Sequence, residues 1–375
     1  MPVAVSVPIE KHLHRTFQGI PGIARTRGGR LFVTWYAGGW SECRDNFSLL
    51  AFSDDDGYSW TEPVAVVDPP FTEVRSFDPT LWCAPDGRIY WFWAQGCGSK
   101  SGVVGILDEV FDGLEGVWYS ILENPDAPKR EFRFSAPRRI SNGIMLNKPQ
   151  VFSDGKWVLP CSLWSLPSNN RKIHESLMPL YGAMMLVSSD KGENFSVHGA
   201  VDVTQIPGGE SFDEHQFLEL SDGTIHCYIR AKCGIARALS RDGGRSWEVP
   251  ELTTLPGPNC RFSLMRLSSG RVLLVTNNSM TKRERLTAFL SDDEGVTWPY
   301  SLLLDERVGV SYPDGIQNED GSIDLVYDFE RFKGGYIYRA KFTEADIIGG
   351  HCGDGTILRQ EINHSEPVPP GIIPE

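Results

Sequence analysis

The sequence predicts an all-β protein folded as a six-bladed β-propeller, with the whole chain, residues 1–375, in one domain. Three observations lead to this prediction. An eight-residue pattern, Ser-x-Asp-x-Gly-x-x-Trp/Phe, occurs four times, and a glycine-containing turn followed by a β-rich aromatic run occurs six times. The turns are also spaced about one four-stranded blade apart. Self-similar segments at such a period are typical of repeat architectures.

The eight-residue pattern is expected to be structural. Its copies occupy residues 53–60, 188–195, 240–247 and 291–298. In each copy the acidic side chain can accept backbone N–H bonds across a tight turn, the glycine takes a conformation that other residues resist, and the aromatic ring fills the gap beneath. We therefore expect the four copies to lie on outer turns of the blades.

The second repeat counts the blades. Its turns lie at residues 28–30, 86–88, 154–156, 222–224, 269–271 and 320–322, with spacings of 58, 68, 68, 47 and 51 residues. Each turn joins two strand-like runs, as in a β-hairpin. The second unit lacks the eight-residue pattern, and we expect an irregular loop over residues 98–142. Residues 343–349 are predicted to form a short capped helical turn, and residues 366–375 a tail or a strand that helps to close the ring.

Composition restricts the partners. The net charge is −13 and no basic tract offsets it, which argues against nucleic acid or an anionic membrane as a partner. Met1 leads directly into polar sequence, so we expect a cytoplasmic protein, or a secreted one from which a signal peptide has been removed. The eight cysteines form no Cys-x-x-Cys pair, and no cofactor or metal site is predicted. The oligomeric state stays open.

The eight-residue pattern is the Asp box, and the chain resembles the sialidase (neuraminidase) superfamily of β-propellers. Glu214 precedes a hydrophobic strand and an Asp-Gly turn, as a glutamate does in that family. Tyr312 lies just before the last glycine turn, where the family has its nucleophilic tyrosine. A phenol with a pKa near 10 is a poor nucleophile unless a neighbouring carboxylate takes its proton. The resemblance therefore implies a catalytic Tyr312–Glu214 pair, as in glycosidases that use tyrosine.

The resemblance also implies substrate-binding residues. Arg230 and Arg283 match two of the three arginines with which sialidases hold a substrate carboxylate, although Arg285 is close to the second position. Asp45 lies between the first inner strand and the first Asp box, where the family has its general acid/base. Asp328 matches an acid that positions the first arginine. Further polar candidates at inner-strand positions are Arg75, Asp78, Lys148 and His215.

The first motif of the family departs from its usual form. Sialidases open with an aromatic-Arg-Ile-Pro motif, whereas residues 17–21 read Phe-Gln-Gly-Ile-Pro. We interpret Gln18 as the replacement of the arginine and Gly19 as an insertion. Losing a charge-assisted hydrogen bond to a carboxylate costs roughly 1.5–3 kcal/mol, unless Arg44 or Arg75 compensates. This departure favours a relative that acts on another sugar, such as a uronate or a neutral deoxysugar.

The leading hypothesis is an exo-acting glycoside hydrolase that removes a terminal sugar, either acidic or neutral, from an oligosaccharide or glycoconjugate. Tyr312 would attack the anomeric carbon, Glu214 would accept its proton, and Asp45 would protonate the leaving oxygen. A second hypothesis is a polysaccharide lyase that cuts beside a uronate, for instance between rhamnose and glucuronate, and His215 and Lys148 would suit that reaction equally well. A third is a glycan-binding propeller without catalysis.

Overall fold

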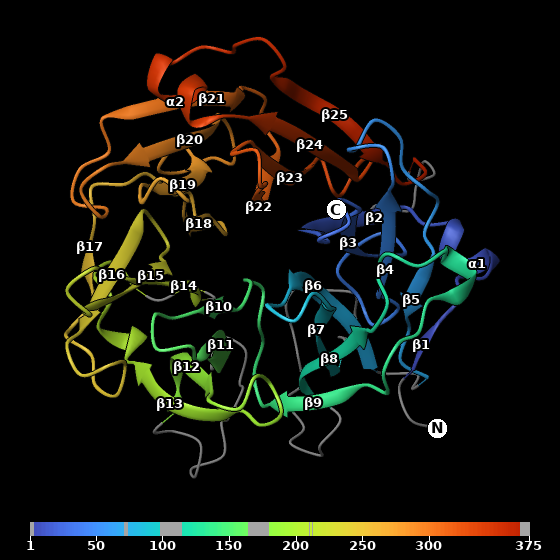
Figure 1. The fold of residues 1–375 in the computed structure, drawn as a ribbon, viewed down its shortest axis with the longest axis horizontal. Coiled ribbons are helices and arrows are strands. Elements are labelled where there is room, and N and C mark those ends of the chain that lie inside the picture. The colour runs from blue at the N-terminus through green and yellow to red at the C-terminus, as the bar shows by residue number, and fades with distance from the viewer. Residues whose placement is uncertain are drawn as a thin grey trace.

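The computed structural model describes residues 4–70, 74–97, 115–163, 180–209, 211 and 213–367. Six antiparallel sheets are arranged in a ring around a central channel (Figure 1), so the predicted six-bladed propeller is confirmed. Each blade comes from one continuous segment of chain, and its first strand lies innermost. The exception is blade 1, where the N-terminal strand β1 adds a fifth, outermost strand by pairing with β5.

The strands follow the order of the blades. Blade 1 contains β1 (Val5–Ser6), β2 (Phe17–Arg25), β3 (Leu31–Gly38), β4 (Phe47–Ser53) and β5 (Ala65–Val67), with helix α1 (Glu10–Leu13) between β1 and β2. Blade 2 contains β6 (Val74–Cys83), β7 (Ile89–Cys97), β8 (Gly116–Leu122) and β9 (Arg138–Ser141). Blade 3 contains β10 (Gln150–Val151), β11 (Trp157–Leu163), β12 (Gly182–Ser188) and β13 (Ser196–Val201).

The remaining three blades are equally regular. Blade 4 contains β14 (Asp213–Glu219), β15 (Ile225–Arg230), β16 (Ile235–Ser240) and β17 (Glu251–Leu252). Blade 5 contains β18 (Ser263–Arg266), β19 (Val272–Asn277), β20 (Leu286–Ser291) and β21 (Tyr300–Asp305). Blade 6 contains β22 (Val310–Gln317), β23 (Ile323–Phe329), β24 (Tyr336–Phe342) and β25 (Ile357–Asn363).

Both sequence repeats have the structure that was predicted for them. The six glycine turns join the two innermost strands of each blade. We call the end of the ring that carries them the turn end. The four Asp boxes join the third and fourth strands, at the outside. In the first box, Ser59 donates its backbone N–H to Asp55 over 2.8 Å, and Trp60 Nε1 donates to the carbonyl of Gly57 over 3.1 Å. The hydrogen bonds from Ser59 lower the pKa of Asp55 to about 2.

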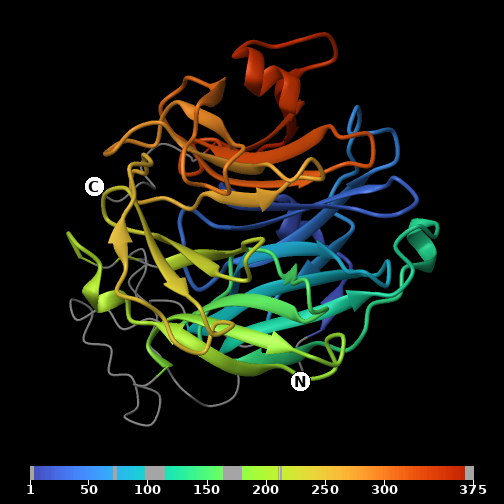
Figure 2. The ribbon, with the colours of Figure 1, turned by 60° about the vertical axis from the view of Figure 1, so that its left-hand side comes forward.

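Two loop predictions had different outcomes. The expected irregular loop over residues 98–142 is wrong in its later part, because β8 and β9 lie there and complete blade 2. Residues 98–114 lie outside the described residues. The short helix is confirmed as α2 (Glu344–Gly349), in which the Thr343 side chain accepts a hydrogen bond from the backbone N–H of Asp346. This helix lies at the outer edge of the ring (Figure 2). Of the predicted tail, residues 368–375 are outside the described part of the chain.

Hydrophobic side chains between neighbouring blades make up the core. One cluster, for example, joins blades 5 and 6 through Leu273, Leu290, Leu325 and Ala340, all fully buried. Neighbouring innermost strands contact one another around the channel, for example β2 with β6 and β22, and β14 with β18. Among the described residues, no helix is both long and apolar enough to cross a membrane.

Candidate active site at one end of the channel

The backbone itself marks one end of the channel. Four innermost strands, β2, β6, β14 and β22, each have a bulge close to their start. At each bulge one non-glycine residue has a positive φ: Ile20 (55°), Asp78 (47°), Glu214 (32°) and Tyr312 (54°). This conformation is strained for residues with a side chain, and such strain concentrates at functional sites. Three of these four residues are among those predicted from the sequence.

Tyr312, Glu214 and Arg230 form the centre of the site. The Tyr312 hydroxyl lies 3.4 Å from Glu214 Oε1 and accepts a hydrogen bond from Arg230 Nη1 over 3.1 Å. Arg230 also forms an ion pair with Glu214. The three residues are only 3–5% exposed. Burial raises the pKa of Tyr312, so the phenol is protonated at neutral pH, and Glu214 is the carboxylate within reach of its proton.

Three guanidinium groups surround the Tyr312 ring. Arg230 contacts its hydroxyl, while the Cζ atoms of Arg283 and Arg331 lie 4.9 Å and 4.8 Å from the ring centre. Asn259 orients two of the three, because its Oδ1 accepts from Arg230 Nε over 2.9 Å and its carbonyl accepts from Arg283 over 3.1 Å. Arg283 is thus the residue at the site, whereas its neighbour Arg285 is exposed.

Arg331 was missed in the sequence analysis, and it lies against Gly19 of β2. A Cβ atom on Gly19 would lie 3.0 Å from Arg331 Cδ and 2.9 Å from Asp328 Oδ2. The residue of β2 that faces the site is therefore Gly19. Gln18 points away: its side chain is fully buried, accepts from Arg15 Nε over 2.7 Å and donates to Asn363 over 3.1 Å. Our assignment of Gln18 to the arginine position and to substrate binding is thus corrected.

Among the described residues, two buried atoms on side chains beside Tyr312 have no partner, Arg331 Nη1 and Glu214 Oε2. Buried polar atoms are normally hydrogen-bonded, and each exception needs an explanation. These two atoms lie on side chains that contact Tyr312, one a cationic donor and the other an anionic acceptor. A ligand with both acceptor and donor groups would satisfy them.

Asp45 lies outside this cluster. Asp45 and Arg44 are exposed and line a neighbouring cavity of about 620 Å³. The carboxylate of the same loop that does reach the cluster is Glu42, whose Oε1 lies 3.1 Å from Arg331 Nη2. Burial acts to raise the pKa of Glu42, but Arg331 and Arg75 outweigh it, and the pKa is lowered. Glu42 is therefore ionised in the free protein.

Arg75, Asp78 and Asp328 complete the cluster. Arg75 donates to Asn46 over 3.0 Å and stacks over Phe77 at 4.1 Å. Burial, assisted by the charges of Glu42 and Glu214, raises the pKa of Asp78 to about 7. Asp328 accepts a hydrogen bond from the backbone N–H of Ile20 over 3.0 Å and so fixes the strained turn of β2.

His215 and Lys148 are not brought to Tyr312. His215 is 1% exposed, and its Nε2 lies 2.8 Å from the carbonyl of Met184. Burial lowers the pKa of His215 to about 4, so the ring is a neutral part of the core. Lys148 forms an ion pair with Asp314 and lines a cavity at the turn end of the channel. Neither side chain is placed to act as a base beside Tyr312.

Comparison with known proteins agrees with this architecture. A family model described as "BNR repeat-like domain" matches residues 29–325. The chain belongs to this BNR repeat-like family. Together with the six-bladed ring and the four Asp boxes, the match makes the chain a β-propeller of the sialidase superfamily.

Two curated relatives of this BNR repeat-like chain are sialidases by name. A sialidase of Micromonospora viridifaciens is 31% identical over 190 residues, which cover 47% of this chain and 27% of the relative. An anhydrosialidase of Macrobdella decora is 28% identical over 178 residues, which cover 40% of this chain and 23% of the relative. The matches therefore span about a quarter of the length of these relatives.

Solved structures show the same fold at low identity. A Hadza microbial sialidase has a TM-score of 0.67 and 20% identity, with 85% of this chain and 64% of that chain covered. A protein of unknown function from Dyadobacter fermentans has a TM-score of 0.62 and 17% identity, with 88% of this chain and 94% of that chain covered. The NanB sialidase of Streptococcus pneumoniae has a TM-score of 0.62 and 14% identity, with 87% and 67% covered.

Proposed function

We propose that the protein is an exo-acting glycoside hydrolase that releases a terminal acidic sugar from an oligosaccharide or glycoconjugate. One observation carries the proposal: Tyr312 lies within reach of the carboxylate of Glu214 and is surrounded by Arg230, Arg283 and Arg331. A nucleophile, its base and a group of anion-binding side chains are thus brought together in one buried cluster. The names of the curated relatives agree with this chemistry.

The reaction follows from the positions of Tyr312 and Glu214. The phenol oxygen of Tyr312 attacks the anomeric carbon as the bond to the leaving oxygen breaks, and the phenol proton passes to Glu214 Oε1 at 3.4 Å. Arg230 donates to the same phenol oxygen over 3.1 Å, and this stabilises the negative charge that develops there. Water then attacks the anomeric carbon and gives a proton to the carboxylate of Glu42, the glycosyl–tyrosine bond breaks, and the proton on Glu214 returns to the phenolate oxygen.

We assign Glu42, rather than Asp45, as the acid that protonates the leaving oxygen. Glu42 is the residue of that loop inside the cluster, held by Arg331. A substrate carboxylate bound to Arg331 would take the arginine away from Glu42 and add a second negative charge nearby. Both changes favour the protonated form of Glu42. The acid would thereby gain its proton when the substrate binds.

Arg331 bears on the choice of sugar. The departure of the first motif favoured a sugar other than that of an ordinary sialidase, such as a uronate or a neutral deoxysugar, but Arg331 supplies a guanidinium group beside Gly19 and Tyr312. Planar guanidinium groups hold carboxylates through two parallel hydrogen bonds. With Arg230 and Arg283, three such groups are available to the carboxylate of a sialic acid or a uronate.

The experiment is a screen of the purified protein against aryl sialosides, aryl uronides, aryl rhamnosides and uronate-bearing polysaccharides. Aryl release, reducing ends and near-ultraviolet absorbance are recorded together. Release of an acidic sugar without a rise in absorbance is the expected result. A rise in absorbance shows the double bond of a lyase product and contradicts hydrolysis, and binding of the same glycans without turnover supports the non-catalytic hypothesis. Tyr312→Phe is the control for contaminating activity.

A further inference from the structure

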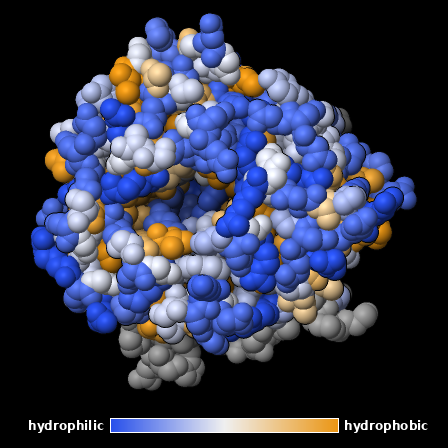
Figure 3. All heavy atoms as spheres, in the orientation of Figure 1, coloured by the Kyte–Doolittle hydropathy of each residue, from blue (hydrophilic) through white to orange (hydrophobic). Residues whose placement is uncertain are grey.

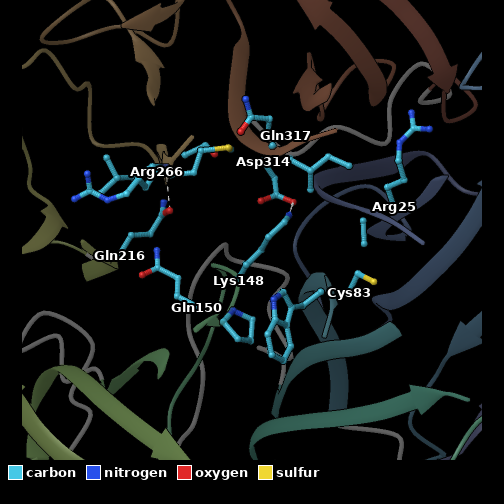
Figure 4. Close-up of a pocket in the computed structure, with 16 residues that line it drawn as sticks. Arg25, Cys83, Lys148, Gln150, Gln216, Arg266, Asp314 and Gln317 are labelled. Carbon is cyan, nitrogen blue, oxygen red and sulfur yellow. Dashed lines mark hydrogen bonds and ion pairs between the residues drawn. The ribbon is translucent and has the colours of Figure 1, made fainter. Parts of the chain in front are cut away.

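The turn end of the channel contains a separate cavity. Its volume is about 390 Å³, and it is lined by residues from all six blades. Figure 4 labels at least one polar or sulfur-containing residue from each blade, among them Arg25, Cys83, Gln150, Gln216, Arg266 and Gln317. Figure 3 shows the hollow at the centre of this face, within a largely hydrophilic rim. This cavity is not lined by any of the side chains that surround Tyr312, namely Glu214, Arg230, Arg283 and Arg331.

Arg261 lies across the channel between its two ends. Its guanidinium is fully buried and donates to the backbone carbonyls of Pro21 and Tyr312, both over 2.8 Å, and of Leu146 over 3.1 Å. These carbonyls belong to three different blades. Arg261 Cζ lies 5.6 Å from the ring centre of Tyr312, and its charge also contributes to lowering the pKa of Lys148 at the other end. The cavity at the turn end is therefore a site of its own.

The floor of the cavity is an ion pair with unused hydrogen-bonding capacity. Lys148 Nζ pairs with Asp314 Oδ2, which also accepts from the backbone N–H of Ile23 over 2.8 Å. Among the described residues, Lys148 has this one partner and Asp314 Oδ1 has none. The pair thus presents an acceptor beside free ammonium donors. A hydroxyl group both donates and accepts, so two adjacent hydroxyls match this floor, whereas an anion would be repelled by Asp314.

The wall combines an aromatic ring with further polar groups. Trp82 is half-buried and is fixed by an edge contact with Trp157, at 4.7 Å between ring centres, and a tilted contact with Tyr90 at 5.8 Å. Gln150 and Ser263 add an amide and a hydroxyl to the lining of the cavity. The apolar face of a pyranose ring can lie on an indole while its hydroxyls reach such groups.

We propose that this cavity binds a neutral sugar unit of a glycan, at the opposite end of the channel from Tyr312. Lys148, Asp314 and Gln150 contact the hydroxyls, and Trp82 contacts the ring. Small-ligand sites range over roughly 300–1,000 Å³, so a cavity of about 390 Å³ suits one or two sugar units. The proposal does not depend on the hydrolysis proposed above, because it needs neither Tyr312 nor the arginines around it.

The test is titration of the full chain with lactose, methyl β-galactoside and methyl α-rhamnoside, followed by calorimetry and by saturation-transfer NMR. We expect at least one probe to bind with a millimolar Kd. Gln150→Ala is expected to weaken that binding about three- to tenfold through the loss of its hydrogen bonds, and Trp82→Phe is expected to weaken it while keeping an aromatic ring against Trp157. Gln205→Ala, an exposed glutamine on the connection between β13 and β14 that does not line the cavity, and Tyr312→Phe are expected to leave it unchanged.

Three results would overturn the proposal. The first is the absence of binding for all three neutral probes. The second is that inorganic phosphate binds more tightly than any sugar and that Lys148→Met removes the phosphate binding, since the cavity would then be an anion site. The third is sugar binding that Tyr312→Phe removes and Gln150→Ala does not, because the sugar would then occupy the cluster around Tyr312. Unfolding curves for each variant show whether the fold is retained.

Discussion

The two ends of the channel are built by the same six innermost strands, yet they differ in backbone and charge. At the Tyr312 end four of the six strands have a bulge and a positive φ angle near their start. Four arginines share the space there with four carboxyl groups: Arg75, Arg230, Arg283 and Arg331 with Glu42, Asp78, Glu214 and Asp328. At the turn end the strands are regular, and one ion pair forms the floor. Among the innermost strands, the bulges with positive φ angles lie at the Tyr312 end, and buried arginines and carboxyl groups gather around Tyr312 there. Such features reduce stability unless partners compensate for them, which is why we place the chemistry there.

The largest difference between the two ends should be seen on removing the Tyr312 hydroxyl. Tyr312→Phe is expected to lower kcat for an acidic glycoside by about a thousandfold or more, since it removes the attacking oxygen. Sugar binding at the turn end should persist. Tyr327→Phe is the matched control, because this buried tyrosine of β23 donates to Asp305 over 3.0 Å, away from the site. Steady-state kinetics with both variants measures the effect, and full activity of Tyr312→Phe would exclude Tyr312 from the mechanism.

Arg261 lies between the two ends, and its contribution to the stability of the ring can be tested by substitution. Arg261→Met leaves three buried carbonyls without a donor, and each such loss costs about 1–3 kcal/mol. The free energy of unfolding should therefore fall by about 3 kcal/mol or more, as measured by denaturant titration. Arg266→Met, an exposed arginine of the same blade paired with Glu294 over 3.2 Å, should cost less than about 1 kcal/mol. Equal effects of the two substitutions would show that Arg261 does not tie the blades together.

The sequence predicted the fold well because its signals are local. Asp boxes and glycine turns specify their own turn geometry through short-range hydrogen bonds and backbone conformation. The number of glycine turns therefore predicted the number of blades. Tyr312, Glu214 and Arg230 were found because they adjoin such signals. Blade 2 was harder to interpret, since β8 and β9 are joined without an Asp box.

The rest of the site depends on side-chain direction and on contacts between distant segments. Successive strand residues face opposite sides, so His215 points into the core although Glu214 faces the axis. The bulge of β2 likewise decides that Gly19, and not Gln18, faces the site. Arg331, Glu42 and Asn259 lie on connections between strands, and only the closed ring brings them to Tyr312. One signal was available: Arg331 follows the predicted Asp328 by three residues.

A substitution series on Arg331 tests whether the arginine has moved from β2 to the loop after β23. Arg331→Gly is expected to lower kcat/KM for an acidic glycoside about ten- to a hundredfold, the value of a charge-assisted hydrogen bond of roughly 1.5–3 kcal/mol. Gly19→Arg alone should also impair activity, because its Cβ would lie 3.0 Å from Arg331 Cδ. The double variant Gly19→Arg/Arg331→Gly should recover part of the loss. Failure of the double variant to exceed Arg331→Gly would contradict the relocation.

The smallest expected effect concerns pH and Asp78. With a pKa near 7, this carboxyl is neutral in weakly acidic solution and becomes an additional negative charge beside Glu42 and Glu214 at higher pH. The value of kcat/KM for an acidic substrate should therefore decrease through about pH 7, by roughly tenfold or less, because kcat/KM reports the ionisation of the free enzyme. Asp78→Asn should abolish this decrease.

The pH dependence of the free energy of unfolding tests the pKa of Asp78 independently. Because folding raises the pKa of Asp78 above its unfolded value near 4, the folded state favours the protonated carboxyl. Its contribution to stability is complete below about pH 4 and is lost as the pH rises through about 7. Unfolding curves of the wild type and of Asp78→Asn across this range should therefore converge at low pH and separate at neutral pH, with the variant relatively more stable there. Parallel curves would mean that Asp78 titrates normally, and the charge difference between the two ends of the channel would then be larger by one carboxylate.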